Sequence, residues 1–111
     1  MPQVSPAVHS LPPAAIAALG KLGADLATAR KRRRQSLKDW AQRLQVSIPT
    51  LMRLERGDPT VSMGVYCTAL WMINRHEALA AAADPKEDLA ALEAEIKDAN
   101  RRHRVRGDQG G

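Results

Sequence analysis

The stretch that most constrains the fold runs from Ser36 to Gly57, and its pattern, SLKDWAQRLQVSIPTLMRLERG, predicts two short helices joined by a tight turn. Ser36 and Ser47 each stand where a side-chain hydroxyl can cap a helix N-terminus. Pro49 fits only in the first turn of the second helix, where no backbone hydrogen bond is lost, and Gly57 suits the C-terminal end of that helix. Helices this short are not stable alone, so their apolar faces must pack on each other and on a third element.

The apolar residues of this stretch fall on faces that would pack inward. Trp40, Ala41 and Leu44 share one side of the first helix, and Leu51 and Leu54 share one side of the second. The outer edge of the second helix then carries two arginines among apolar and small residues: Ile48, Pro49, Thr50, Met52, Arg53 and Arg56. A short helix with this edge fits a DNA major groove, although an ordinary helical hairpin with a solvated charged face would show the same pattern.

The spacing of these residues is similar to that of a known family. The pattern S-x-x-x-x-A-x-x-x-x-V-S-x-x-T-L-x-R-L-E-R-G-D-P, which ends at Pro59, resembles the helix-turn-helix of Cro and the phage repressors, the XRE family. The resemblance covers residues 19–74 and implies an all-α, four- to five-helix bundle with a lambda-repressor-like DNA-binding domain plus a C-terminal helix. Two positions depart from the family pattern. Leu37 replaces the usual Gln, and Gln45 replaces the usual Gly of the turn, so we expect positive φ at Gln45.

The resemblance also assigns roles to the exposed residues. It implies that the base edges are faced by Ile48, Pro49, Thr50, Met52 and Arg53. Arg53 is the candidate for a hydrogen bond to a base, most simply guanine, and the apolar residues can meet thymine methyl groups. We expect phosphates to be held by Ser36, Lys38, Arg56 and the basic run Arg30, Lys31, Arg32, Arg33 and Arg34. That run ends the first predicted helix, where cations also stabilise the helix dipole without any ligand.

The positive charge of the chain is concentrated in the same region. The net charge is +5, with 17 Lys and Arg against 12 Asp and Glu. Residues 14–75 hold 11 Lys and Arg against 4 acidic residues, whereas residues 76–111 hold 6 against 8. This asymmetry is what a phosphate-binding surface requires, and it favours double-stranded DNA as the partner.

The composition favours one small all-α domain. The chain has 111 residues, no Phe and 3% aromatic residues, so its core must be built from Leu, Ala, Ile, Val and Met. Leu19, Leu22, Leu26 and Ala29 recur with helical spacing after Pro13, which suits the first turn of a helix. No apolar run is long enough to predict a membrane span, and no signal-peptide pattern is present. With the single cysteine Cys67, these features lead us to expect a cytoplasmic protein.

The helix predicted from Met63 to Asn74, with Ser62 as its cap, is apolar nearly all round. Tyr66, Leu70 and Ile73 form the natural core face. A helix with further apolar stripes is buried on more than one side, which a chain of this size can hardly provide alone. We therefore expect a subunit interface in a homodimer, formed by Met63, Cys67, Trp71 and Met72, with Trp71 and Met72 as its anchors.

The rest of the chain divides around this domain. Residues 1–13 are rich in proline and are expected to be a disordered lead-in, residues 14–75 the DNA-binding domain, and residues 76–104 a helical extension for dimer or partner contact. Asp84 and Pro85 predict the start of the last helix. Its narrow apolar seam, a second candidate interface, consists of Leu89, Leu92 and Ile96. Residues 105–111 are expected to be a flexible tail.

Catalysis is not predicted. His9, His76 and His103 are scattered, and no metalloprotease, phosphate-loop or nucleophile-elbow motif is present. We therefore expect no enzyme, no cofactor, no metal and no small-molecule substrate, and no membrane association. The rival to a DNA-binding regulator is a protein-interaction module whose basic surface is incidental.

A second, narrower resemblance concerns the partner. The pattern L-G-x-x-L-x-x-A-R, then E-R-G-D-P-x-V-S-x-G-x-Y, A-L-W and A-D-P-x-x-D, resembles the HipB-like antitoxins. These proteins bind their own operator and a HipA-like kinase toxin. The resemblance implies an autorepressing antitoxin with such a toxin as partner, and the alternative is a stand-alone XRE-type repressor.

Overall fold

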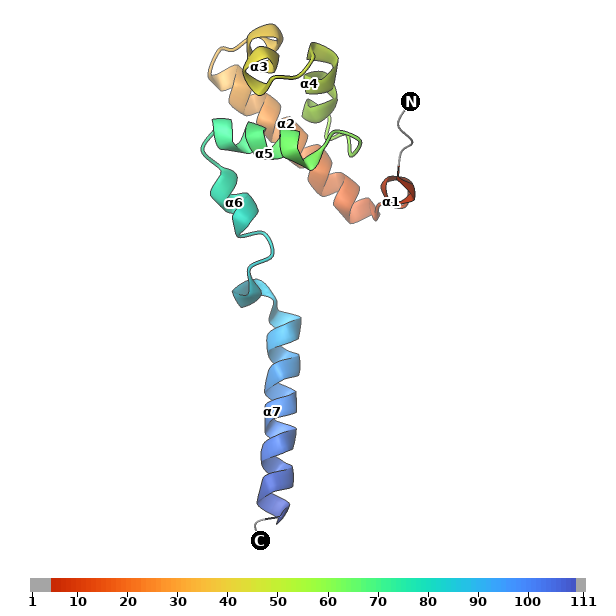
Figure 1. The fold of residues 1–111 in the computed structure, drawn as a ribbon, viewed down its shortest axis with the longest axis vertical. Helices are drawn as coiled ribbons and strands as arrows, with labels where there is room; N and C mark the ends of the chain where they lie inside the picture. The colour runs from red at the N-terminus through yellow and green to blue at the C-terminus, as the bar shows by residue number, and fades with distance from the viewer. Residues whose placement is uncertain (1–4, 110–111) are drawn as a thin grey trace. The chain divides into compact units, whose positions relative to one another are not determined.

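A computed structural model describes residues 5–109, and every regular element among them is a helix (Figure 1). The elements are α1 (Pro6–His9), α2 (Pro13–Arg32), α3 (Leu37–Leu44), α4 (Ile48–Glu55), α5 (Met63–Met72), α6 (His76–Ala80), the 3-10 helix η1 (Pro85–Glu87) and α7 (Leu89–Gln109). They form two compact units, residues 1–76 and 77–111. The all-α class, with a helix-turn-helix bundle and a further C-terminal helix, is confirmed. None of the described helices has the length and hydropathy needed to cross a membrane.

The core of the first unit lies where α2, α3, α4 and α5 meet. α4 packs against α2 and α3, and α3 also contacts α5. Leu51 and Leu54 of α4 are 0% and 1% exposed, as their spacing predicted. The other buried apolar residues are Leu26, Trp40, Ala41, Leu44, Val61, Tyr66 and Ala69. Because both sides of the short α4 rest on neighbours, its outer edge is held in a fixed orientation.

Two glycines bring α2 and the end of α4 into direct backbone contact. A Cβ atom added at Gly23 would lie 2.4 Å from the Gly57 nitrogen and 2.7 Å from the Leu54 carbonyl oxygen. A Cβ added at Gly57, which has φ of 73°, would lie 2.4 Å from the Leu19 carbonyl oxygen. No side chain fits at either position, so glycine sets how closely these helices approach.

Four helices of the first unit, α2 to α5, end in one recurrent motif, in which a residue of left-handed conformation reverses the chain. These residues are Arg34, Gln45, Gly57 and Asn74, with φ between 56° and 73°. The amide of the following residue donates back into the last helical turn, as from Val46 to the Ala41 carbonyl (3.0 Å). The positive φ predicted for Gln45 is confirmed, at 60°. A non-glycine residue in this region carries a steric cost.

The second unit corrects two predicted boundaries. Asp84 accepts a hydrogen bond from the Lys86 amide (2.9 Å), but it opens only the 3-10 turn η1, and Asp88 then caps α7 through the Ala91 amide (3.1 Å). The last α-helix therefore begins at Leu89 and not at Pro85. It continues to Gln109, so residues 105–109 are helical where a flexible tail was predicted. Arg101, Arg102 and Arg104, which directly precede this segment, are good helix formers. Residues 110–111 of the predicted tail lie outside the described residues.

The N-terminal segment holds one short helix that the sequence did not predict. Ser5 accepts a hydrogen bond from the Ala7 amide and caps the single turn α1. The lead-in predicted for residues 1–13 is therefore partly helical, and its residues 1–4 lie outside the described residues. Pro13 begins α2, as its fixed φ predicted.

Candidate nucleic-acid interface

The turn between α3 and α4 is fixed by hydroxyl caps. The Ser36 hydroxyl accepts from the Asp39 amide (3.0 Å), and the Ser47 hydroxyl accepts from the Thr50 amide (3.2 Å), which confirms both predicted caps. Ser47 also donates to the Thr50 hydroxyl oxygen (2.9 Å), which leaves the Thr50 proton free to be donated outward. The Ser62 hydroxyl caps α5 in the same way, through the Val65 amide (3.3 Å).

The outer edge of α4 carries the residues predicted to face DNA bases. Ile48, Pro49, Met52 and Arg53 recur at i, i+1, i+4 and i+5, so they share one side of the helix. Ile48 is 39% and Met52 43% exposed, and Thr50 is half-buried at the border of this edge. We call these five residues the α4 edge. It is a mostly apolar ridge that ends in a guanidinium group.

Arg53 has a charged partner that sequence reasoning did not identify. Its Nε lies 3.8 Å from Asp58 Oδ2 in the loop after α4. The other oxygen, Oδ1, accepts from the Thr60 amide (2.8 Å) and the Thr60 hydroxyl (2.6 Å). The Thr60 hydroxyl, followed by its amide and the charges of Arg53 and Arg56, lowers the pKa of Asp58 below 3.8 despite partial burial. Asp58 is therefore an anion on the C-terminal side of the α4 edge.

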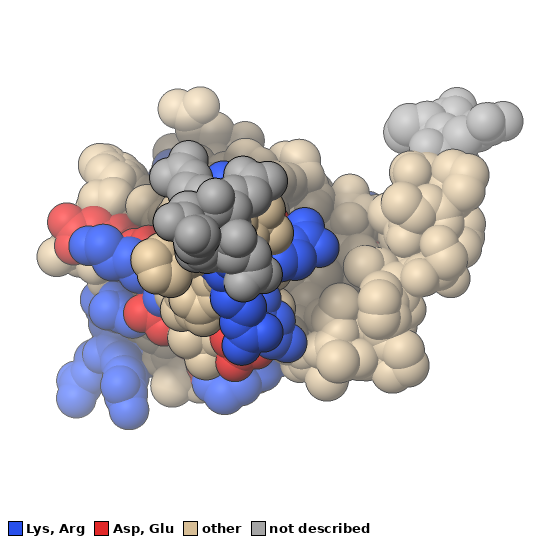
Figure 2. Space-filling view, turned by 90° about the horizontal axis from the view of Figure 1, so that it is seen from below, with Lys and Arg blue, Asp and Glu red and all other residues tan. Residues whose placement is uncertain are grey.

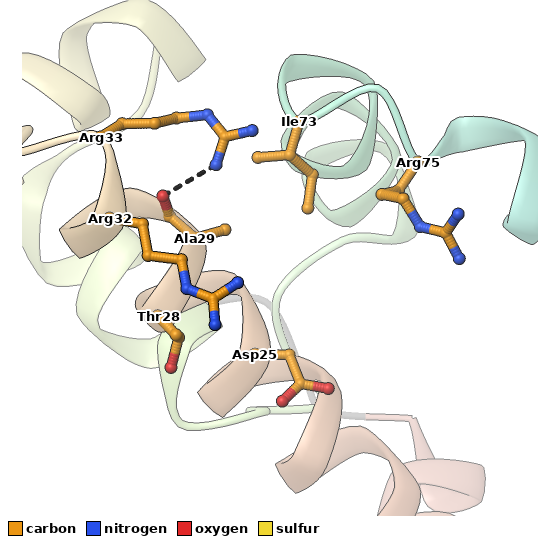
Figure 3. Close-up of a pocket in the computed structure, with 7 residues that line it drawn as sticks. All are labelled: Asp25, Thr28, Ala29, Arg32, Arg33, Ile73 and Arg75. Carbon is orange, nitrogen blue, oxygen red and sulfur yellow. Dashed lines mark hydrogen bonds between the residues drawn. The ribbon is translucent and has the colours of Figure 1, made fainter.

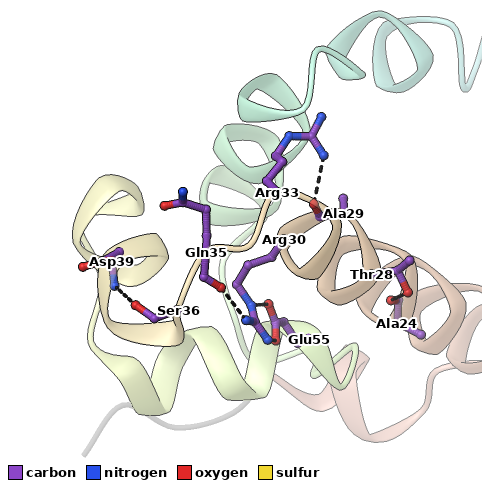
Figure 4. A network of polar contacts seen from close by, with 9 residues as sticks. All are labelled: Ala24, Thr28, Ala29, Arg30, Arg33, Gln35, Ser36, Asp39 and Glu55. Carbon is purple, nitrogen blue, oxygen red and sulfur yellow. Dashed lines mark hydrogen bonds and ion pairs between the residues drawn. The ribbon is translucent and has the colours of Figure 1, made fainter.

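Arg30 corrects one of the predicted phosphate contacts (Figure 4). This side chain is buried, with 8% of the residue exposed. Its Nε and Nη2 donate to the two carboxylate oxygens of Glu55 (2.8 and 3.1 Å), and its Nη1 donates to the Gln35 carbonyl (2.9 Å). Arg30 thus ties the end of α2 to the end of α4 and to the segment before α3. It is a structural residue of the helix-turn-helix and is not available as a surface cation.

The other residues of the basic run lie on different parts of the surface. Arg33 donates from Nη1 to the Ala29 carbonyl (2.9 Å) and faces Ile73 (Figure 3). Together with Arg32 and Arg75 it lines an open cleft of about 390 Å³ between the ends of α2 and α5. Lys31 and Arg34 are exposed, as are Ser36, Lys38 and Arg56 beside the helix-turn-helix. The predicted phosphate-binding set is therefore divided between two surfaces.

The residues predicted for a subunit interface differ in exposure, and they belong to two different units of the chain. Met63 and Trp71 of α5 are 67% and 64% exposed, and Cys67 between them is half-buried. Met72 is also half-buried, because it packs partly against the core of the first unit, and its role as an interface anchor stays a prediction. Its position is shifted round the helix from Trp71, which directs the two side chains to different sides. Leu89, Leu92 and Ile96 belong to the second unit.

Comparison with known proteins agrees with this geometry. A family model described as a helix-turn-helix domain matches residues 21–84, which is more than half of the chain. The chain therefore belongs to the helix-turn-helix domain family, in the XRE-like class, and is a DNA-binding regulator. No curated protein and no solved structure gave a significant match. Within residues 5–109, no three His, Cys, Asp or Glu side chains are grouped so that they could hold a metal ion.

Proposed function

We propose that the protein binds a specific operator sequence through the α4 edge and regulates transcription there, most simply as a repressor of its own gene. The α4 edge carries this proposal, because it is an exposed ridge on a rigidly supported short helix. Ile48, Pro49 and Met52 offer apolar contacts that suit thymine methyl groups, and Thr50 keeps a proton to donate. Arg53 supplies most of the polar readout, with guanine as the simplest target.

Asp58 favours a base contact over a phosphate contact for Arg53. A carboxylate near Nε restrains the guanidinium and leaves Nη1 and Nη2 to donate to a base. The same anion disfavours a phosphate close to this side of the loop. Arg53 is therefore better placed to read a base edge than to hold the DNA backbone.

The phosphate contacts are proposed for the exposed cations and the caps around the α4 edge. Lys38 and Ser36 lie at the N-terminus of α3, where backbone amides and the helix dipole also favour an anion. Arg56 lies just beyond α4. The exposed residues of the basic run, Lys31, Arg32, Arg33 and Arg34, add to this electrostatic attraction, whereas Arg30 does not.

We further propose that the protein acts as a homodimer. Met63, Cys67 and Trp71 recur at i, i+4 and i+8, so they lie on one side of α5. Met63 and Trp71 expose a large apolar surface there. Large exposed apolar side chains of this kind are typical of interface anchors. A two-fold dimer would place two α4 edges in half-sites about one helical turn apart on the DNA.

The partner proposed beyond DNA is a HipA-like kinase toxin, which would make the protein an antitoxin. The support is the resemblance around Gly64, Tyr66, Leu70–Trp71 and Ala83–Pro85. In this reading the protein is no enzyme, requires no cofactor and acts in the cytoplasm. Affinity purification from native extract with mass spectrometry tests the partner: recovery of a kinase-like protein supports it, and recovery of the protein with itself alone contradicts it.

The proposed reading of DNA is tested with Arg53→Ala and the upstream DNA of the gene, in a fluorescence-anisotropy assay over a library of single-base substitutions. The variant should lose about 1–3 kcal/mol on the specific site and lose its preference at one base pair. Lys21→Ala is the control, because Lys21 is an exposed cation paired with Asp25 on α2 (2.7 Å). An equal loss on every sequence would assign Arg53 to the DNA backbone instead.

A further inference from the structure

α7 carries an apolar seam that its own unit leaves uncovered. Leu89, Leu92, Ile96 and Ala99 recur at i, i+3, i+7 and i+10, and the first three are 67%, 38% and 59% exposed. Within the described part of residues 77–111, the element that packs on α7 is η1, which directly precedes its first turn. A narrow seam of this spacing is the pattern by which one helix packs along another.

The charges along this unit are segregated by sign. Residues 84–95 hold five acidic side chains and one lysine, a net charge of −4. Residues 96–107 hold five basic side chains and one aspartate, a net charge of +4. Figure 2 looks toward the C-terminal end of α7, and Lys and Arg side chains outnumber Asp and Glu side chains on the face that it shows. Part of the basic half is neutralised locally, since Asp98 pairs with Arg101 (3.3 Å) and Arg102 (2.8 Å).

These two features together specify one partner. We propose that α7 pairs with α7 of a second copy of the chain in antiparallel orientation. The acidic half of each helix then lies beside the basic half of the other, whereas a parallel pair would set acid against acid and base against base. Each copy of α7 thus carries both an acidic and a basic half, so a second copy of the same chain is a complementary partner.

The seam itself fits the same arrangement. When two copies are placed antiparallel, Leu92 lies opposite Ile96 and Leu89 lies opposite Ala99, so that all four residues of each seam are covered. The register also places Asp88 beside Arg102 of the second copy. Its like-charged contacts are at the two-fold axis, where the two copies of Glu95 meet on one side of the seam and the two copies of Glu93 meet on the other.

This contact goes beyond the proposed function, because it is formed by a unit that does not carry the α4 edge. It would join two DNA-binding units through their C-terminal helices, independently of the apolar face of α5. Joining two binding units in this way raises the effective concentration of the second for a neighbouring half-site.

Site-directed disulfide formation tests the pairing and its direction in the full chain. Cys67 is first replaced (Cys67→Ser), and Leu89→Cys and Ala99→Cys are made in separate, differently tagged chains. When these chains are mixed in a glutathione buffer at micromolar concentration, the antiparallel pair predicts a disulfide between the two different chains. A chain with Ala94→Cys in place of Ala99→Cys is the control, because position 94 lies on the opposite side of α7 and should cross-link at least ten-fold less.

Every other outcome overturns the proposal. Disulfides within the Leu89→Cys population alone would show a parallel pair. Thiols that remain free in both chains, while both react with a thiol reagent, would show that the seam faces another surface. A charge exchange gives an independent check by sedimentation velocity. Asp88→Lys and Arg102→Glu should each weaken α7 self-association at least ten-fold, because each sets like charges at the contact between positions 88 and 102. An equimolar mixture should restore the association, since opposite charges then meet at both contacts; an unrestored mixture contradicts the charge argument.

Discussion

The interaction between Arg30 and Glu55 gives the sharpest stability prediction. The two side chains are each 10% exposed, and they are joined by two hydrogen bonds of 2.8 and 3.1 Å. Removing one partner leaves a buried charge without compensation, which costs about 3–5 kcal/mol. A small domain is stable by only about 5–15 kcal/mol in total. Arg30→Met, which keeps the apolar stem, should therefore remove a large fraction of the stability of the first unit.

A double-mutant cycle separates the loss of the Arg30–Glu55 interaction from the other effects of removing Arg30. In Arg30→Met the Glu55 carboxylate and the Gln35 carbonyl both lose their donor, whereas in Arg30→Met/Glu55→Leu only the carbonyl does. The double variant should therefore be more stable than the sum of the single losses allows, with a coupling of about 2–3 kcal/mol. Urea unfolding followed by far-UV circular dichroism is the assay, since Trp71 is 64% exposed and would add an invariant fluorescence background.

The exposed pair Lys21–Asp25 is the matched control. It has the same charge types at 2.7 Å, but its side chains are 78% and 62% exposed, so Lys21→Ala should cost less than about 1 kcal/mol. A loss below about 1 kcal/mol for Arg30→Met, or a cycle without coupling, would refute the reasoning. Arg30 would then return to the candidates for phosphate contact.

Three further predictions concern single residues of the first unit. Gly23→Ala should destabilise it by about 1–3 kcal/mol or more, because the new methyl group meets backbone atoms of the α4 end that cannot move aside; an unchanged urea midpoint would contradict this close contact. Gln45→Gly should stabilise the unit by up to about 1 kcal/mol, since glycine removes the cost of the left-handed conformation; a destabilised variant would show that the Gln45 side chain contributes contacts. Burial raises the pKa of Tyr66 to about 12, and its hydroxyl donates to the Asp58 carbonyl (2.7 Å). The contribution of this phenol is therefore complete below pH 10, the ordinary pKa, and is lost as the pH rises toward 12. Tyr66→Phe should cost about 1 kcal/mol at pH 8 and progressively less above pH 10, whereas a constant difference would exclude Tyr66 as the titrating group.

Local signals in the sequence predicted the elements of the helix-turn-helix closely. Ser36, Ser47 and Ser62 are caps, Pro49 lies in a first turn, and Leu51 and Leu54 are buried, because each of these properties depends on residues a few positions apart. The positive φ at Gln45 followed in the same way from the turn that the chain must make there.

The interactions that sequence reasoning missed are those set by tertiary contact. The sequence presents Arg30 as one of five adjacent surface cations, because its partner Glu55 lies 25 residues away in the chain. Arg30 lies four residues after Leu26, so both residues share the packed side of α2. This spacing is the signal in the sequence that could have indicated the burial of Arg30. The apolar pattern assigns Met72 to a subunit interface, although Met72 also packs partly against the core of the first unit. The sequence predicts too early a start for α7, because Asp84 and Asp88 both suit a cap and only Asp88 opens an α-helix.

The roles proposed for the α4 edge and its surrounding cations follow from exposure and chemistry, so binding to duplex DNA is their direct test. The affinity for the upstream DNA of the gene is measured against salt concentration by fluorescence anisotropy, with the full chain and an unrelated duplex as reference. Each phosphate contact contributes a slope of about −0.9 to the plot of log K against log salt. The four proposed cations that lie outside the cleft between α2 and α5 (Lys31, Arg34, Lys38 and Arg56) therefore predict a steep fall, with a slope of about −3 to −4 per chain when most of them are engaged. A flat salt dependence, or no binding to either duplex at low salt, would contradict the central claim that this surface binds DNA.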